Sequence, residues 1–241
     1  MHKTPEQTRA YVGDFVGPAA ELIAQADIAL LAPFVDLEAL RAALGTSSIG
    51  FGAQDCFWEP EGAYTGAVSA AMLKALGCQY CIVGHSERRQ YFAETDETVA
   101  LKVSALLERD ITPIVCVGES FEEHQTGQTH ERVSAQVNAA LGHLSDAERS
   151  MLVLAYEPIW AIGTGLCDDP QSANATIEHI RHTAGGLSEA RVLYGGSMKS
   201  LNAASLCAQP HIDGGLVGSA SLQPAEFLQL IGNALQVFDA R

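Results

Sequence analysis

The chain has 241 residues, and its 47% hydrophobic content is typical of a globular protein with a sizeable core. Its 14 Lys and Arg against 29 Asp and Glu give a net charge of -15, so we expect neither a nucleic-acid partner nor a membrane partner. No run is long enough to span a bilayer and the first ten residues lack the apolar region of a signal peptide, so the sequence predicts a cytoplasmic protein.

Helical stretches alternate with continuously apolar, strand-like runs along the whole chain. Thr4, Pro5 and Gln7 give a cap, a first-turn proline and a capping-box partner, so the order begins with a helix. The strand-like runs lie at 28–33, 49–53, 80–84, 112–117, 151–156, 191–195 and 213–218. Seven βα units of this kind predict a parallel sheet covered on both faces, and no linker marks a boundary. We therefore expect one α/β domain over residues 1–241.

The six cysteines are scattered and predict free thiols in a chain large enough to need no disulfides. They are Cys56, Cys78, Cys81, Cys116, Cys167 and Cys207. Cys78 and Cys81 form a Cys-x-x-Cys, but the pair enters an apolar run, whereas a redox pair normally opens a helix. Buried small side chains are therefore favoured over a redox or metal pair, and we expect no metal site there.

Residues able to do chemistry stand where four of the apolar runs end. His85 ends YCIVGH, and Glu157 follows the run at 151–156. Ser197 ends VLYGGS, while Gly218 and Ser219 end GGLVGS. Because the carboxyl ends of parallel strands meet at one edge, these residues predict a base, an imidazole and two glycine-rich loops in one site. Backbone N–H groups in such loops favour an anion, and a phosphate is the natural ligand.

Each of these signals also has a structural explanation. A lone histidine is often an ordinary hydrogen-bond partner, and Gly195 and Gly196 could mark only a tight turn. Glu157 could belong to a structural ion pair, and Trp160 alone would be core packing. The coincidence of all four signals at one end of one sheet favours a functional site.

Six strings in the chain resemble triosephosphate isomerases. They are AYEPIWAIGTG, IVGHSERR at 82–89, GAQD at 52–55, TPIVCVGE at 112–119, YGGS at 194–197 and LVGSASL at 216–222. The resemblance runs in order from about residue 1 to the C-terminus. It implies an eight-stranded TIM barrel, usually a homodimer, that interconverts dihydroxyacetone phosphate and glyceraldehyde 3-phosphate without a cofactor.

The resemblance also implies roles for individual residues. Glu157 matches the general base and His85 the electrophile, an imidazole kept neutral by a helix N-terminus, for which this family is the standard example. Glu87 and Cys116 match supporting positions. The phosphate is expected at the backbone of four residues, which are Gly163, Ser197, Gly218 and Ser219.

Two mobile or protruding segments are implied in the same way. Residues 158–168 resemble a flap that closes over the substrate. Its first hinge would run from Pro158 to Trp160, and its second from Leu166 to Asp168. Residues 55–64 resemble a loop that docks into a second subunit, with Thr65 near the neighbouring site.

The sequence departs from the family pattern at its start. Family members begin with a strand ending in Asn-x-Lys, and Met1 aligns directly after that Lys. The resemblance therefore predicts a barrel lacking strand 1, starting with helix 1, with activity impaired by the absent Lys. Lys3 beside Thr4 is expected to be a solvated residue at the helix start. Further departures are Ala67, Leu166 and Ser219, where the family often has Glu, Lys and Gly.

Three functions remain open from the sequence. The first is a triosephosphate isomerase whose opening residues are missing from this chain. The second is a catalytically inactive barrel with an assembly or binding role. The third is another phosphate-binding barrel enzyme, such as a sugar-phosphate epimerase, which would be expected to show metal ligands or paired acidic catalysts. The IVGHSERR and EPIWAIGTG strings favour the first function.

Overall fold

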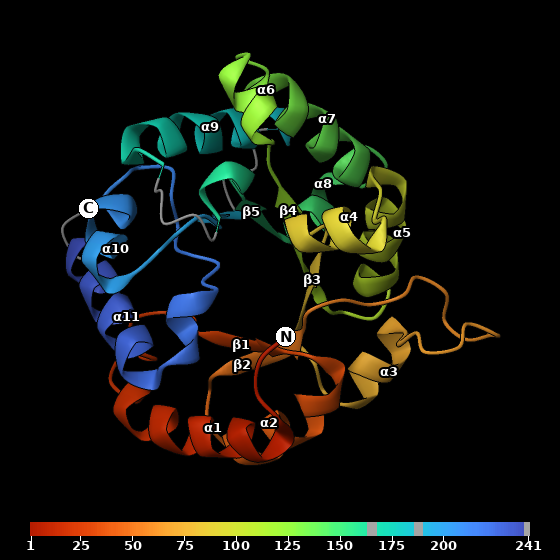
Figure 1. Cartoon of the computed structure of the whole chain (residues 1–241). Coiled ribbons are helices and arrows are strands. Elements are labelled where there is room, and N and C mark those ends of the chain that lie inside the picture. Colours follow the sequence, from red (N-terminus) through yellow and green to blue (C-terminus); the bar gives the residue numbers. More distant parts are fainter. Residues whose placement is uncertain (163–167, 186–189, 239–241) are drawn as a thin grey trace.

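The computed structural model describes residues 1–162, 168–185 and 190–238, which form a curled parallel sheet ringed by helices (Figure 1). The sheet of the described residues has six strands in chain order. They are β1 (Ala29–Ala32), β2 (Gly50–Ala53), β3 (Tyr80–Val83), β4 (Thr112–Val117), β5 (Val153–Tyr156) and β6 (Arg191–Tyr194). Every neighbouring pair is parallel, so the chain returns outside the sheet after each strand. This is the architecture of an α/β barrel.

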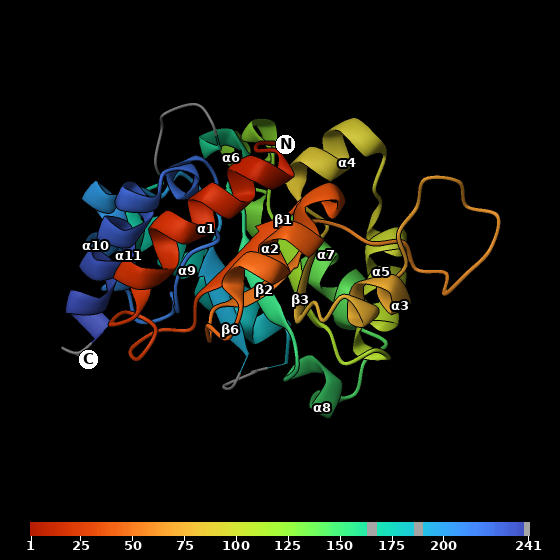
Figure 2. The same ribbon diagram turned by 90° about the horizontal axis from the view of Figure 1, so that it is seen from below.

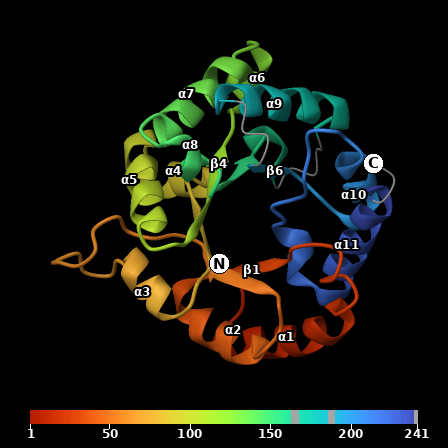
Figure 3. The same ribbon diagram turned by 180° about the vertical axis from the view of Figure 1, so that it is seen from behind.

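Helices occupy the return connections and cover the outer face of the sheet (Figures 1 and 2). The α-helices are α1 (Pro5–Ala19), α2 (Leu37–Leu44), α3 (Ala70–Ala75), α4 (Ser86–Phe92), α5 (Asp96–Leu107), α6 (Phe121–Gln125), α7 (Thr129–Leu141), α8 (Asp146–Arg149), α9 (Pro170–Thr183), α10 (Ser200–Cys207) and α11 (Pro224–Phe238). Short 3₁₀ helices are η1 (Phe34–Asp36), η2 (Ile159–Ala161) and η3 (Ser219–Leu222). The view from behind shows the same ring from the opposite side (Figure 3).

The prediction of a seventh strand at 213–218 is wrong for the described residues. Only one bridge forms there, between Tyr194 and Gly215. Tyr194 N donates to Gly214 O at 3.0 Å, and Leu216 N donates to Tyr194 O at 2.9 Å. Asp213 N also donates to Val192 O at 3.0 Å, but within the described residues the bonds of this segment to β6 make one bridge and not a ladder. The other six predicted runs form strands within two residues of their expected ends.

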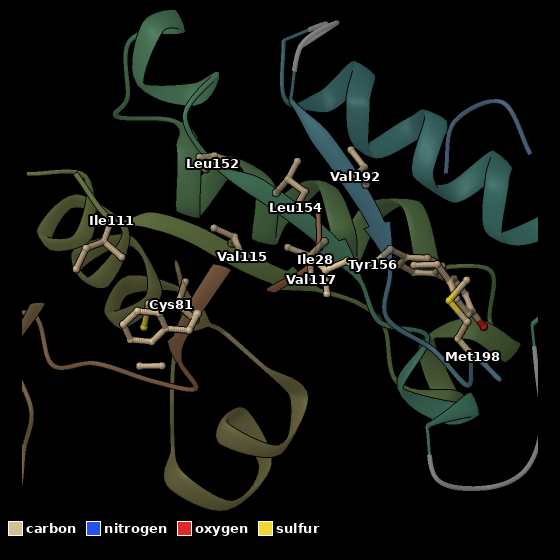
Figure 4. Close-up of a cluster of buried hydrophobic side chains, with 14 of the residues drawn as sticks. Ile28, Cys81, Ile111, Val115, Val117, Leu152, Leu154, Tyr156, Val192 and Met198 are labelled. Carbon is tan, nitrogen blue, oxygen red and sulfur yellow. The ribbon is translucent and has the colours of Figure 1, made fainter. Parts of the chain in front are cut away.

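Both faces of β2 to β5 are largely buried, as the continuously apolar runs predict, whereas β1 is mostly half-buried. One set of side chains packs under the helices and includes Val115, Leu154 and Val192 (Figure 4). The alternate side chains point into the ring and form a small cluster of their own, comprising Ile82, Ile114, Cys116 and Ala155. The ring is therefore a filled core, and space for a ligand has to lie at its ends.

Helix α1 begins where the sequence predicts. Thr4 is its cap, and Gln7 completes the capping box, with Gln7 Oε1 accepting from Thr4 N at 2.9 Å. The expectation of a solvated Lys3 is wrong. Its ammonium donates to Leu222 O at 3.0 Å and lies 4.7 Å from the centre of the Tyr11 ring. The Leu222 carbonyl and the Tyr11 ring thus hold Lys3, and with it the N-terminal residues, against η3 and α1.

Candidate active site

Parallel register places His85 and Glu157 at the same edge of the sheet. His85 stands two positions past the end of β3. The pairing of β3 with β4 and of β4 with β5 places His85 level with Tyr156, the last residue of β5, and Glu157 follows Tyr156 directly. Two side chains that lie 72 positions apart in the sequence, counted as 157 minus 85, therefore meet.

His85 and Glu157 are bonded to each other. His85 Nε2 lies 3.0 Å from Glu157 Oε1, and the other carboxylate oxygen, Oε2, accepts from Ser86 N at 2.9 Å. His85 is also the cap of α4, because its Nδ1 accepts from Glu87 N at 3.2 Å. A nitrogen that accepts a backbone N–H carries no proton of its own, so the proton of the neutral ring is on Nε2 and points at the carboxylate.

The surroundings of His85 act on its pKa in opposite directions. Burial lowers this pKa, whereas the hydrogen bond to Glu157 and its negative charge raise it, helped by the charges of Glu87 and Glu94. The net pKa of His85 lies above its ordinary value in this arrangement. The carboxylate of Glu157 is thus the main group that favours a charged imidazole here.

Two glycines allow the backbone around Glu157 to approach its neighbours. A Cβ on Gly118 would lie 1.8 Å from Glu157 O, and a Cβ on Gly195 would lie 2.9 Å from Glu157 Cγ. No real side chain tolerates contacts this short, so both positions require glycine. Gly118 received no role from the sequence, although it stands just past the end of β4.

Trp160 is anchored to a buried carboxylate that the sequence did not single out. Trp160 Nε1 donates to Glu119 Oε1 at 2.8 Å, and the hydroxyl of Tyr156 donates to the same oxygen at 3.1 Å. Glu119 is fully buried. Its position two residues beyond β4, at the reactive edge of the sheet, was the available signal. The anchor fixes the chain three residues after Glu157.

The two glycine-rich loops lie side by side at this edge. Ser197 and Gly218 each stand three residues past a partner of the Tyr194–Gly215 bridge, on parallel segments. Ser197 is half-buried, while Gly218 and Ser219 are exposed to solvent. The second loop enters η3, a 3₁₀ helix of four residues. The backbone groups of the second loop are therefore presented by a short 3₁₀ turn at Ser219–Leu222.

The structure describes part of the expected flap. Gly163 and Leu166 lie outside the described residues. Pro158 is buried and precedes η2, in which Ala161 N donates to Pro158 O at 2.8 Å. Asp168 is buried just before α9. Both ends of the expected flap are thus packed into the fold.

Cys116 and Glu87, expected to support the site, differ in their surroundings. Cys116 is fully buried, and this burial raises the pKa of its thiol well above the ordinary value, with the charge of Glu157 adding to the effect. The thiol is therefore neutral. Glu87 is exposed and has a carboxylate oxygen 4.0 Å from His85 Nδ1.

Residues 55–64 form a long excursion that projects beyond α3 (Figures 1 and 2). Inside it, the ring of Phe57 stacks on Trp58 with centroids 4.0 Å apart and contacts Tyr64 at 4.6 Å. Thr65 at its end is exposed. The loop therefore carries its own aromatic cluster away from the main core.

The described residues hold no group of three or more His, Cys, Asp or Glu side chains arranged to bind a metal ion. None of their helices is both long enough and apolar enough to cross a membrane. Five cysteines are free and buried, as the sequence predicts, and they are Cys56, Cys78, Cys81, Cys116 and Cys207. Cys167 lies outside the described residues.

A parallel barrel sheet with a glutamate–histidine pair at its carboxyl edge, beside two glycine-rich loops, defines an α/β-barrel enzyme. The family model described as triosephosphate isomerase matches residues 1–234. The chain is 43% identical over 237 residues to the triosephosphate isomerase of Caldanaerobacter subterraneus subsp. tengcongensis, an alignment covering 96% of this chain and 95% of the relative.

Two further relatives agree with this match. The triosephosphate isomerase of Rubrobacter xylanophilus is 45% identical over 237 residues, covering 96% of this chain and 93% of the relative. That of Moorella thermoacetica is 46% identical over 238 residues, covering 96% and 94%. The chain belongs to the triosephosphate isomerase family.

Proposed function

We propose that this chain interconverts dihydroxyacetone phosphate and glyceraldehyde 3-phosphate through an enediolate intermediate. The observation that carries the proposal is the 3.0 Å pair of His85 Nε2 and Glu157 Oε1 at the carboxyl edge of the sheet, in a chain of this family. The reaction moves one proton between adjacent carbons. It needs a base, an oxygen-polarising donor and a phosphate anchor, and no cofactor.

Glu157 is the base in this proposal. Its carboxylate is buried, and it holds its place through His85 and Ser86 N, both of which it has to leave to reach a substrate carbon. Carboxylates positioned in this way contribute about 10²- to 10⁴-fold through general acid–base catalysis. The proton taken from one carbon returns to the other through the same carboxylate.

His85 polarises the substrate oxygen. Once that oxygen replaces Glu157 at Nε2, the main group that raises the pKa of His85 has moved away. The backbone N–H of Glu87 still occupies Nδ1 and opposes a second proton on the ring. The neutral imidazole is therefore the form that donates its Nε2 proton to the developing enediolate oxygen.

The substrate phosphate binds the backbone N–H groups of the two glycine-rich loops, at Ser197, Gly218 and Ser219, with Gly163 completing the set. With a net charge of -15, the protein as a whole repels a dianion, so the attraction has to be local. Loop N–H groups supply such a local positive field. Residues 158–168 then act as the flap, with hinges at Pro158 to Trp160 and at Leu166 to Asp168.

The enzyme is a homodimer and acts in the cytoplasm in this proposal. Residues 55–64 dock into a second copy and Thr65 lies near its site, which is supported by the projection of this loop from the barrel (Figure 2). The net charge of -15 supports a small-molecule substrate and no nucleic-acid or membrane partner.

The test is the Glu157→Gln variant, assayed for turnover and for incorporation of solvent deuterium into dihydroxyacetone phosphate by proton NMR. We expect both rates to fall by about 10³-fold or more, because the amide keeps the shape of the side chain but accepts no proton. Glu178→Gln, a change at an exposed glutamate of α9, is the matched control and should leave both rates unchanged. Unchanged exchange in Glu157→Gln would contradict the proposal.

A further inference from the structure

His124 of α6 lies against the Trp160 anchor. Its imidazole stacks on the indole of Trp160 with ring centroids 4.3 Å apart and an angle of 28° between the planes. His124 Nδ1 is 3.6 Å from Glu119 Oε1, the oxygen that already accepts from Trp160 and Tyr156. The imidazole thus contacts both partners of the anchor at once.

The carboxylates facing His124 come from both sides of the anchor. Glu119, between β4 and α6, is fully buried, and its Oε2 has no hydrogen-bond partner in the described part of the chain. Asp168, before α9, is also buried, and its Oδ2 lacks a partner within the same residues. Burial raises the pKa of both carboxyls, while the charge of His124 lowers both. Asp169 is the further acidic group acting on Asp168.

Other charged groups near this cluster are engaged elsewhere. Glu123 of α6 caps its own helix by accepting from Ser120 N at 2.7 Å, and it pairs with Arg132 at 3.6 Å. His124 is thus the cationic group that bears on both Glu119 and Asp168. The His124 side chain is 38% exposed, so solvent reaches the imidazole.

We infer that His124 is a pH-dependent positioning residue, whose charged form fixes Trp160 against Glu119 and whose neutral form loosens that contact. The charged ring gains a cation–π contact with the indole and an ion pair with Glu119, and the neutral ring has neither. The inference rests on the proposed function in one respect. Trp160 lies three residues after Glu157, so a fixed indole opposes the movement by which Glu157 leaves His85.

The direction of the effect follows from this coupling. We expect kcat to be lower when His124 is charged, by about two- to five-fold, the size of one cation–π contact at a partly exposed site. KM should change little, because His124 contacts no residue assigned to the phosphate. The charged ring therefore lowers kcat at acid pH.

The first test needs no activity. A charged imidazole stacked on an indole quenches its fluorescence, so the emission of Trp160 should fall as the pH is lowered from 8.5 to 5.5. We expect this titration to be absent in His124→Gln and in Trp160→Phe, which assigns it to this pair. A wild-type emission that does not change over this range would overturn the inference.

The second test compares kcat across the same pH range in wild type, His124→Gln and His124→Lys. The Lys variant stays charged throughout and the Gln variant stays neutral. We expect wild type to match the Lys variant at pH 5.5 and the Gln variant at pH 8.5. Parallel profiles for all three proteins would refute the link to turnover. The Glu157→Gln variant should lose activity but keep the fluorescence titration, so failure of the proposed function and failure of this inference give different results.

Discussion

The imidazole Nε2 of His85 and the carboxylate of Glu157 are 3.0 Å apart, so the proposed electrophile and the proposed base are each other's partners in this structure. Ser86 N holds the second carboxylate oxygen at 2.9 Å. Substrate therefore has to take over the Nε2 proton of His85, and this exchange sets the carboxylate free. In the proposed reaction, this pair holds the base in a buried position until the substrate binds.

Replacement of His85 by Gln should lower kcat by about 10²- to 10³-fold, the usual effect of removing one donor that stabilises a developing oxyanion. Steady-state assays in both directions give kcat and KM. KM should change less than kcat, because the donor matters most when charge develops on the oxygen. His143→Gln, at an exposed position bonded to Ser104, is the control. A normal kcat in His85→Gln would contradict the assigned role.

Replacement of Gly118 by Ala should lower kcat by displacing the backbone that carries Glu157. The new Cβ would lie 1.8 Å from Glu157 O, so one of the two strand ends has to move. A misplacement of about 1 Å is enough to cost on the order of 100-fold in rate. Gly13→Ala is the matched control, since Gly13 is an exposed helical position with nothing within 4 Å of the added atom. That variant should be as active as wild type and more stable by about 1 kcal/mol in urea unfolding.

The stability of the protein should fall as the pH is lowered from about 7.5 to 5.5 through the stacked pair of His130 and His179. Their rings lie 4.1 Å apart and nearly parallel, at 5°. Burial lowers the pKa of His179, and the charges of His130 and His182 lower it further. A histidine with a lowered pKa binds fewer protons in the folded than in the unfolded state, so folding loses free energy as the pH falls below the ordinary value of 6.5.

The His130→Gln variant measures this contribution. The free energy of unfolding, from urea titrations at fixed protein concentration, should depend less on pH in this variant than in wild type. His2→Gln, in the exposed N-terminal residues, is the control. Identical pH dependence in His130→Gln and wild type would show that the charge of His130 does not contribute to the lowered pKa of His179.

Replacement of Trp58 by Ser should weaken the proposed dimer. Trp58 stacks on Phe57 in the projecting loop, and a buried aromatic of this kind commonly contributes 2 kcal/mol or more to an interface. Sedimentation velocity should then show a dissociation constant raised by roughly 30-fold or more. Leu201→Ser removes a 94% exposed leucine on α10 and should leave the assembly unchanged. A wild-type chain that sediments as a monomer would contradict the dimer itself.

The sequence predicts much of this fold for identifiable reasons. Continuous apolar runs place six strands correctly, since residues such as Leu154 have to be covered on both faces of the sheet. The convergence of His85 and Glu157 follows from the parallel order of their strands. The seventh run, at 213–218, holds three glycines, which weaken a strand, and its residues are exposed or half-buried, so it meets β6 at one bridge only.

Other features depend on contacts that local sequence does not encode. His124 reaches Trp160 from a five-residue helix, 36 positions away by the subtraction of 124 from 160. Glu119 could be assigned to the reactive edge but not to the indole nitrogen it binds. Lys3 donates to the carbonyl of Leu222, near the other end of the chain, and the sequence around Lys3 does not predict that acceptor.

The segment around Gly215 is joined to β6 by a single bridge, so this seam should open more easily than the junctions between neighbouring strands of the sheet. Amide hydrogens there, such as that of Leu216, should exchange with solvent long before those of β4, whose residues pair on both sides. Ser197 and Gly218 lie just beyond the bridge, one on each flank. A phosphate held by both loops would close the seam, so the substrate itself would complete the stability of the barrel.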